Sequence, residues 1–427
     1  MILKNLTPRK DKRNFNSIYP KYRGQSLVNV PHMIASLLGV NPKGIPIDES
    51  LYSKRINLKG IKKVVLILLD GFGYKMWLDS NDTASFFGRI SKKGIVIPIT
   101  STFPSTTAVA ITSISTGLEP AAHGLPEWIV YLKEIKMIVN SLPFTSFINK
   151  SKTELTELGF NASILYKGST IYQHLRKHKV RSFTILSRDI SGSAYTGLTK
   201  RGSSIVPYLK LSDGVIRLRE KIASESRAYI HMYADSIDKS THAFGPFSEE
   251  SRAEILSVSE AFEQELVKKV SRHAAKETLI MITADHGHTM FYPNKVIYLN
   301  SDRKLHRYLA SDNGSKVLPT GSPRNIFLHI DPRHLKDAYE HLSKKFSGKA
   351  RVLYSKDAVR MGLFGTSRPS QKFLDRIGDI IMLPREGELI WYEHVKGRKP
   401  KLKGVHGGLS ENEMLVPLAM VRLSDIL

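Results

Sequence analysis

Short aliphatic runs alternate with helical patterns along most of the chain. The clearest run is Lys63–Leu69, KVVLILL, whose continuous apolar character is typical of a parallel strand buried on both faces. Other segments with strand-like apolar patterns are 95–99, 162–166, 182–186, 228–233, 278–283, 325–330 and 415–421. Helical periodicity lies between several of them, at 172–179, 213–224 and 249–275. Alternation of this kind predicts an α/β fold with helices on both faces of a central sheet.

The pattern changes at two places, which predicts three regions. Residues 1–60 contain several prolines and little periodicity outside 32–38, so we expect an N-terminal arm packed on the core. Between about 295 and 404, strand-plus-helix units fill a stretch far longer than an ordinary loop, which predicts an inserted α/β cap subdomain. Residues 61–294 and 405–427 then form the catalytic core. Within it, 128–139 (WIVYLKEIKMIV) is expected to form a hairpin.

Composition narrows the class of protein. With 41% hydrophobic and 24% charged residues, the chain has the balance of an ordinary soluble globular protein. No apolar run approaches the roughly eighteen residues needed to span a bilayer, so no membrane insertion is expected. The basic N-terminus lacks a following apolar segment, which predicts no signal peptide and a cytoplasmic location.

Cysteine content and net charge restrict the chemistry. The absence of cysteine excludes disulfides, thiolate metal sites and cysteine nucleophiles, so any metal must be held by oxygen and imidazole ligands. The net charge of +25 favours acidic partners such as phosphate esters or nucleic acid. The basic residues are spread along the chain, however, and are densest at Arg9–Arg13 and Lys396–Lys403. A solvated basic surface explains most of them.

The stretch Thr100–Gly124 is rich in hydroxyl side chains. It contains a predicted helix of small residues at 107–116, which ends at Gly117. Hydroxyl groups at its start would lie beside free backbone N–H groups and the positive end of the helix dipole, which favour an anion such as phosphate. Serine and threonine are also ordinary N-cap residues, so this stretch alone does not establish a site.

Acidic and imidazole side chains follow several predicted strands. Asp70 ends the first strand, Asp285 and His286 follow 278–283, and Asp238 and His242 are spaced to share one face of a helical turn. His406 lies late in the chain, beside glycines that permit close approach. Each group has a structural interpretation as a cap, a surface pair or a turn. Together they favour a divalent cation, because burying them without a partner is unfavourable.

Five motifs in this order resemble the alkaline phosphatase superfamily and, within it, the type I phosphodiesterase/nucleotide pyrophosphatase family: VVLILLDGFG, FPSTTAVAITSISTGLEPAAHG, DSIDKSTHAFGP, ITADHGH and VHGGLSENEMLVPL. The resemblance implies an alkaline-phosphatase-like fold, with a central, mostly parallel sheet between helices and a cap over a two-metal site. It assigns the ligands of the two metals as Asp70, Asp285 and His286, and as Asp238, His242 and His406. Mixed carboxylate and imidazole ligands suit two zinc ions, with manganese as the alternative.

The resemblance also implies a threonine nucleophile. In the family its hydroxyl begins the helix ten residues before the terminal glycine, which selects Thr107 here. Thr106 is the neighbouring alternative, and an alignment on Thr-Phe-Pro selects Thr102. Helix geometry favours Thr107, because Thr102 would lie before the turn and away from the helix N–H groups.

The implied activity is hydrolysis of a phosphodiester or pyrophosphate through a covalent phosphothreonine, on a phosphate-ester or nucleotide small molecule. Trp128 stands where classical members carry an Asn that binds a phosphate oxygen, and Asn140 could replace that Asn. The candidate substrate-binding residues are therefore Thr106, Trp128 and Asn140. A phosphomonoesterase and a metal-dependent phosphomutase remain alternatives within the superfamily. A basic nucleic-acid-binding protein that retains the fold is the non-enzyme alternative.

Overall fold

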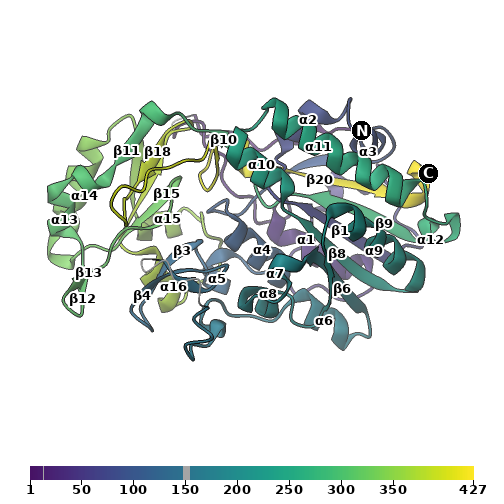
Figure 1. The fold of residues 1–427 in the computed structure, drawn as a ribbon, viewed down its shortest axis with the longest axis horizontal. Helices are drawn as coiled ribbons and strands as arrows, with labels where there is room; N and C mark the ends of the chain where they lie inside the picture. The colour runs from purple at the N-terminus through teal and green to yellow at the C-terminus, as the bar shows by residue number, and fades with distance from the viewer. Residues whose placement is uncertain (13, 148–153) are drawn as a thin grey trace.

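The computed structural model describes residues 1–12, 14–147 and 154–427, so Arg13 of the basic patch Arg9–Arg13 lies outside the described residues. The described chain forms two lobes side by side, each built on a seven-stranded sheet (Figure 1). The larger lobe carries the two ends of the chain. No helix among the described residues is long and apolar enough to cross a membrane.

The larger lobe is built on a mixed, mostly parallel sheet, as expected. Its five parallel strands are joined by β20, which runs antiparallel to both of its neighbours. The side chains of β1 are buried along its whole length, which explains its unbroken aliphatic sequence. In spatial order the strands are β2 (Ile95–Thr100), β20 (Leu415–Arg422), β9 (Thr278–Thr283), β1 (Lys63–Leu69), β8 (Ala228–Ala234), β6 (Arg181–Ser187) and β7 (Ser204–Tyr208).

Helices cover both faces of this sheet (Figure 1). On one face lie α2 (Tyr74–Ser80), α3 (Ser85–Lys93), α9 (Leu211–Ser224), α11 (Glu249–Phe262) and α12 (Arg272–Lys276). On the other lie α1 (Val30–Leu37), α4 (Thr107–Thr116), α6 (Ile171–Lys177) and α8 (Ala194–Thr199). Further helices at the strand ends and lobe junction are α5 (Pro120–His123), α7 (Arg188–Ser191), α10 (Ser236–Phe244) and α17 (Glu411–Met414).

Two predicted elements are wrong because capping side chains prevailed over the apolar pattern. The expected strand 162–166 is instead a short 3-10 turn at Ala162–Ile164, since the Asn161 side chain accepts a hydrogen bond from Ser163 N. The expected helix 249–275 ends in a π-helical turn at Glu263–Val267 and restarts as α12, whose first turn is capped by Ser271.

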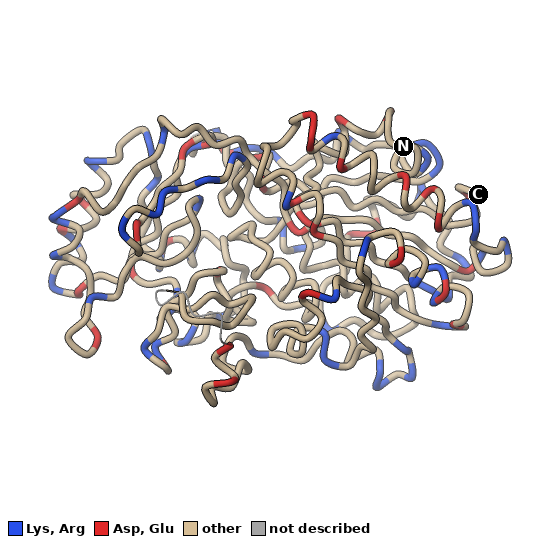
Figure 2. The backbone as a smooth tube through the Cα atoms, in the orientation of Figure 1, with Lys and Arg blue, Asp and Glu red and all other residues tan. Residues whose placement is uncertain are grey.

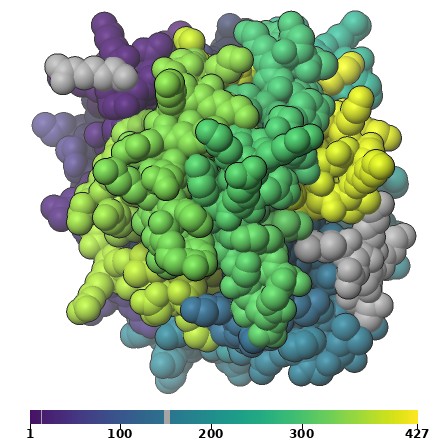
Figure 3. Space-filling model, turned by 90° about the vertical axis from the view of Figure 1, so that its left-hand side faces the viewer, coloured from purple at the N-terminus to yellow at the C-terminus, as the bar shows by residue number. Residues whose placement is uncertain are grey.

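The smaller lobe is built on an antiparallel sheet drawn from two distant parts of the chain. The predicted hairpin at 128–139 is present, and it pairs through β14 with strands from the 295–404 region. Seen end-on in Figure 3, green residues near position 300 and beyond cover most of this lobe, with the blue hairpin region along its lower edge. In spatial order the strands are β16 (Ala350–Tyr354), β17 (Ile380–Pro384), β15 (Asn325–Leu328), β14 (Thr320–Ser322), β3 (Ile129–Leu132), β4 (Met137–Asn140) and β5 (Thr145–Ser146).

Small strand pairs and helices complete this lobe. The pairs are β10 (Thr289–Met290) with β19 (Gly404–Val405), β11 (Val296–Tyr298) with β18 (Leu389–Trp391), and β12 (Ser311–Asp312) with β13 (Ser315–Lys316). The helices are α13 (Arg303–Tyr308), α14 (Leu335–Lys345), α15 (Ser355–Arg360) and α16 (Gln371–Ile377). The division into arm, core and inserted cap stays a prediction.

Two buried arginines hold the lobes together. Arg324, just before β15, donates from Nε and Nη2 to the Glu413 carboxylate at 2.9 and 2.8 Å, and both side chains are fully buried. Arg376 of α16 donates to the carbonyl oxygens of Gly124 and Leu165, each at 2.7 Å. Removing one partner of the buried Arg324–Glu413 pair would cost about 3–5 kcal/mol, so this pair and the Arg376 hydrogen bonds link the lobes close to the strand ends.

Candidate active site

The polar groups predicted from the sequence lie at the carboxyl ends of the central strands. Asp70 follows β1, Asp285 follows β9, and α10, which carries Asp238 and His242, begins just after β8. The short strand β19 returns from the smaller lobe and is followed by His406. In Figure 1, α10 and β10 lie between the two sheets, so the site is at the junction of the lobes.

The first group of side chains, Asp70, Asp285 and His286, is buried at the end of the sheet and is called the deep cluster below. His286 Nε2 lies 3.5 Å from Asp70 Oδ1 and 3.3 Å from Asp285 Oδ2. These two carboxylate oxygens have no hydrogen-bond partner among the described residues. Burial and the neighbouring Asp285 carboxylate raise the pKa of Asp70 well above its usual range. Two buried carboxyl groups with free oxygens fit a bound cation.

The second group, Asp238, His242 and His406, is less enclosed and is called the half-open cluster. His242 Nε2 lies 3.4 Å from Asp238 Oδ1, and these side chains are 24% and 16% exposed. Burial alone would raise the pKa of Asp238, but the adjacent His242 and His288 outweigh it and hold that pKa below its usual range. The carboxylate of this cluster is therefore ionised.

The three predicted imidazole ligands are oriented in the same way. Nδ1 of His286, His242 and His406 lies 3.2, 2.8 and 3.1 Å, respectively, from the backbone carbonyl oxygens of Gly287, Gly404 and Ser105. Because a carbonyl oxygen only accepts, Nδ1 carries the proton in each ring and the lone pair is on Nε2. All three rings therefore direct Nε2, and not Nδ1, toward the carboxylates as the atom available to a metal.

A fourth imidazole, His288, was not predicted as a site residue. Its Nε2 lies 2.8 Å from Asp238 Oδ1, and it forms a third possible ligand group with Asp238 and His286. Burial lowers the pKa of His288 to about 4, so the ring is neutral near pH 7. A Cβ on Gly71, which has φ +73°, would lie 2.7 Å from this Nε2, so glycine is needed there. The His-Gly-His spacing was the available signal.

The three candidate nucleophiles differ in their surroundings. Thr107 is the first residue of α4, is only partly buried, and has Oγ1 3.2 Å from His286 Nε2. Thr106 is buried as the N-cap residue, and its hydroxyl forms no hydrogen bond with the deep cluster among the described residues. Thr102 is also buried, with Oγ1 donating to the Pro104 carbonyl oxygen at 3.1 Å. Only the Thr107 hydroxyl is hydrogen-bonded to a side chain of the deep cluster.

The remaining predicted residues, Trp128 and Asn140, lie on the smaller sheet. Trp128 immediately precedes β3 and is 37% exposed, whereas Asn140 ends β4 with Oδ1 buried and without a partner among the described residues. No hydrogen bond within the described part of the chain joins either side chain to the two clusters. Their predicted contact with substrate stays a prediction.

Glu127, another residue that sequence reasoning missed, links the smaller lobe to the site. Its buried Oε1 accepts from Asn325 Nδ2 at 3.0 Å, and burial raises the pKa of Glu127 to about 7. The same Nδ2 donates to the Gly407 carbonyl oxygen at 2.9 Å, next to His406. No sequence signal marks this link, because its members come from three distant segments.

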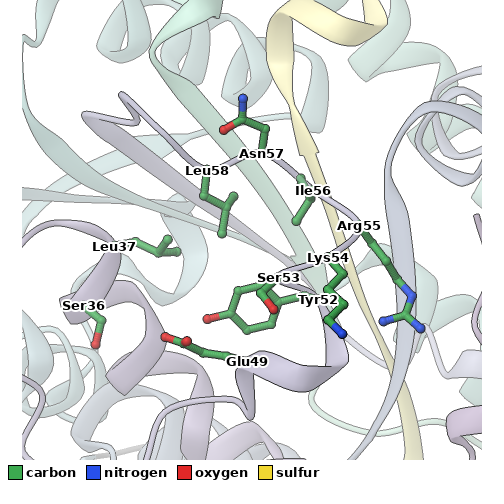
Figure 4. Close-up of a pocket in the computed structure, with 10 residues that line it drawn as sticks. All are labelled: Ser36, Leu37, Glu49, Tyr52, Ser53, Lys54, Arg55, Ile56, Asn57 and Leu58. Carbon is green, nitrogen blue, oxygen red and sulfur yellow. The ribbon is translucent and has the colours of Figure 1, made fainter.

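The N-terminal arm forms a cavity of about 660 Å³ that contains none of the predicted site residues. Figure 4 shows Tyr52 in its middle, between apolar side chains and charged ones. The cavity is lined by Ser36, Leu37, Glu49, Tyr52, Ser53, Lys54, Arg55, Ile56, Asn57 and Leu58. The candidate active site is therefore separate from this cavity.

The fold and the candidate ligand groups are those expected for an alkaline-phosphatase-type α/β protein. A family model described as type I phosphodiesterase / nucleotide pyrophosphatase matches residues 64–409, and the chain belongs to this family. It is therefore a hydrolase that acts on phosphoric ester bonds, in a family whose members depend on metal ions. No curated protein matched the chain.

Solved structures agree with this fold. Murine ectonucleotide pyrophosphatase/phosphodiesterase 5, solved as an inactive threonine-to-alanine variant in complex with AMP, is 18% identical with a TM-score of 0.63, covering 84% of this chain and 87% of its own. The human protein of the same name is 19% identical with the same score and coverage. Phosphonoacetate hydrolase from Sinorhizobium meliloti 1021, in complex with phosphonoformate, is 18% identical with a TM-score of 0.60, covering 85% and 93%.

Proposed function

We propose that the protein hydrolyses a phosphodiester or pyrophosphate bond of a nucleotide-like small molecule through a phosphothreonine formed on Thr107. The observation that carries this proposal is the position of the Thr107 hydroxyl, which begins α4 and lies 3.2 Å from His286 of the deep cluster. An AMP complex of the murine relative, in which a threonine was replaced to inactivate the protein, supports both parts of the proposal.

Two divalent cations are part of the proposal. Asp70, Asp285 and His286 would hold one, and Asp238, His242 and His406 the other. The unpartnered oxygens of Asp70 and Asp285 and the uniform orientation of the imidazoles support this assignment. Nitrogen and oxygen donors suit zinc, with manganese as the alternative. Bound cations would supply Lewis acidity for the attacking hydroxyl and the leaving oxygen.

The chain's own groups account for the remaining steps. Thr107 Oγ1 attacks phosphorus, its proton passes to solvent, and the bond to the leaving oxygen breaks as the Thr–O–P bond forms. Ala110 N donates to the Thr106 carbonyl oxygen, so the N–H groups before it in α4 have no partner within the helix and face the phosphoryl oxygens. Water then attacks the phosphorus of this intermediate and the bond to Thr107 Oγ1 breaks, which restores the hydroxyl and releases the phosphate monoester (inorganic phosphate, where the substrate is itself a monoester).

A phosphomonoesterase is the second candidate. It rests on Trp128, which stands where the family's phosphate-binding Asn would fall, and on Asn140, whose Oδ1 forms no hydrogen bond among the described residues. Phosphomutase activity, nucleic-acid binding and a cytoplasmic location stay predictions.

The test compares single threonine variants loaded with zinc or manganese. We expect Thr107→Ala to lower kcat by about 10³-fold or more on bis-p-nitrophenyl phosphate, because it removes the nucleophile. Thr107→Ser keeps a hydroxyl and should retain activity. Thr106→Ala and Thr102→Ala are matched controls that should stay within about tenfold of the parent. Full activity of Thr107→Ala would contradict the assignment, and a preference for p-nitrophenyl phosphate would favour the monoesterase.

A further inference from the structure

A second polar cavity, of about 400 Å³, lies on the larger lobe at the start of two edge strands. Arg176 lies in the last turn of α6, residues 179–182 lead into and begin β6, and residues 202–204 lead into and begin β7. The parallel strands of this sheet carry the candidate metal ligands at their carboxyl ends, whereas this cavity lies at their amino ends. It therefore lies at the opposite ends of the strands from the candidate metal ligands. Because β6 and β7 are the last two strands on one side of the sheet, it is called the edge pocket below.

The edge pocket is lined by three cations and no acid. The lining residues are Arg176, Lys179, Val180, Arg181, Ser182, Gly202, Ser203 and Ser204. Arg176 and Lys179 are exposed and form no ion pair with any described residue, whereas Arg181 pairs with Glu225 at 3.1 Å. Figure 2 shows several Lys and Arg segments in the tube around α6. Unpaired cations gathered around a concavity create a positive potential that attracts anions.

Lys179 has a left-handed backbone conformation, which is uncommon for a lysine. Lys179 has φ +59°, directly after the end of α6, where a left-handed residue is normally glycine or asparagine. Its N–H donates to the Arg176 carbonyl oxygen at 3.0 Å, which closes the helix end. A lysine thus occupies a position where glycine would be favoured by the backbone, beside two further cations.

Hydroxyl groups line the inner wall of the pocket. Ser182 Oγ is buried and has no hydrogen-bond partner among the described residues, although buried polar groups are normally paired. Ser203 Oγ lies 2.8 Å from Thr184 Oγ1, and Ser204 begins β7. A donor without a partner behind a ring of cations is the arrangement that an oxyanion would complete.

We propose that the edge pocket binds a small molecule through a phosphate group, with Arg176, Lys179 and Arg181 around the anion and Ser182 as a hydroxyl donor. The volume of about 400 Å³ is within the range of small-molecule sites and exceeds what one phosphate needs. Phosphate-bearing ligands from two sources share this chemistry, free pyrophosphate and a nucleoside monophosphate. The pocket lies apart from the candidate active site, so the proposal does not depend on the proposed hydrolysis.

The test measures binding of pyrophosphate and of AMP to the metal-loaded protein by titration calorimetry at low ionic strength. The variants are Arg176→Gln and Lys179→Gly, the latter keeping the left-handed backbone favourable, so both should fold. Lys177→Gln removes a neighbouring charge that does not line the pocket and is the matched control. Hydrolysis of bis-p-nitrophenyl phosphate is measured on the same samples.

We expect the double variant Arg176→Gln/Lys179→Gly to bind pyrophosphate at least tenfold more weakly at one class of sites. Lys177→Gln should keep the parental affinity, and the rate of hydrolysis should stay unchanged in all variants. Tighter binding of AMP than of pyrophosphate at that class of sites would identify a nucleotide as the ligand, and the reverse would identify the free anion. Equal affinity and stoichiometry in the parent and the double variant would overturn the proposal. So would an equal loss of binding in Lys177→Gln, because it would indicate general surface charge.

Discussion

The deep and half-open clusters are made of the same kinds of side chain but are enclosed differently. Asp70, Asp285 and His286 follow central strands and are almost completely buried. In the half-open cluster, Asp238 and His242 come from α10, which lies between the lobes, and these two side chains keep part of their surface in solvent. The larger lobe alone builds the first cluster, whereas the second also requires the strand β19 that returns from the smaller lobe.

This difference in burial predicts a difference in how tightly the two clusters would hold a metal. Asp70 and Asp285 each keep one buried oxygen without a partner among the described residues, which is unfavourable, so a bound cation or a proton on Asp70 would stabilise the deep cluster. In the half-open cluster the Asp238 carboxylate already has imidazole neighbours, with His288 Nε2 at 2.8 Å and His242 Nε2 at 3.4 Å, and solvent can reach it. We therefore expect tight, slowly exchanging metal in the deep cluster and weaker, exchangeable metal in the half-open one.

The largest effect is expected from Asp285→Asn. Loss of a buried carboxylate ligand should lower kcat/KM by about 10³-fold or more, since electrostatic stabilisation at a water-excluded site is lost. Bound metal, measured by elemental analysis, should fall, and added zinc should restore little activity. Recovery of full activity at high zinc would show that the two clusters do not differ in this way.

His242→Gln should have a smaller and partly reversible effect. It removes a ligand from the half-open cluster, so we expect about a 10²-fold loss of kcat/KM that excess metal partly restores. A metal titration of activity compares this variant with Asp285→Asn under identical conditions. An equally severe and irreversible loss in both variants would contradict the distinction.

The smallest expected effect concerns the pH dependence of stability after metal has been removed by chelation. The folded-state pKa of Asp70 is raised above 3.8, so this group lowers stability as pH rises from 3.8 through its folded-state value. The folded-state pKa of Asp238 is depressed, so its stabilisation is present above 3.8 and is lost as pH falls through its folded-state value.

Near neutral pH the chelated Asp70→Asn protein should therefore have a higher Tm than the parent, and the chelated Asp238→Asn protein a lower one. Thermal denaturation followed by circular dichroism checks both signs. The same sign in both variants would contradict the contrast between the clusters.

Most of the larger lobe could be predicted because its signals are local. Continuous aliphatic runs mark β1 and β9, and the residues that follow each run, Asp70 and Asp285, necessarily lie at the same edge of a parallel sheet. Family resemblance supplied the grouping of these ligands, and the structure brings each group together. The assigned catalytic roles stay predictions.

What could not be predicted depends on contacts between distant segments. Glu127 gains its partner Asn325 only because β3 joins strands from the 295–404 region in one sheet. Tyr233, whose hydroxyl donates to Asp70 Oδ2, also lies on a neighbouring strand and has no motif of its own. Apolar patterns indicate which residues are buried but not which buried polar groups meet.

Because the smaller sheet combines two distant parts of the chain, it cannot be completed until late in synthesis. Residue Ile129 of β3 pairs with Gly321 of β14, which the ribosome adds much later. At a synthesis rate of ~5–20 residues per second, β14 is added on the order of ten seconds or more after the hairpin of β3 and β4. During this interval an edge of the hairpin is open to other chains, so pairing between nascent molecules is the characteristic misfolding risk of this architecture.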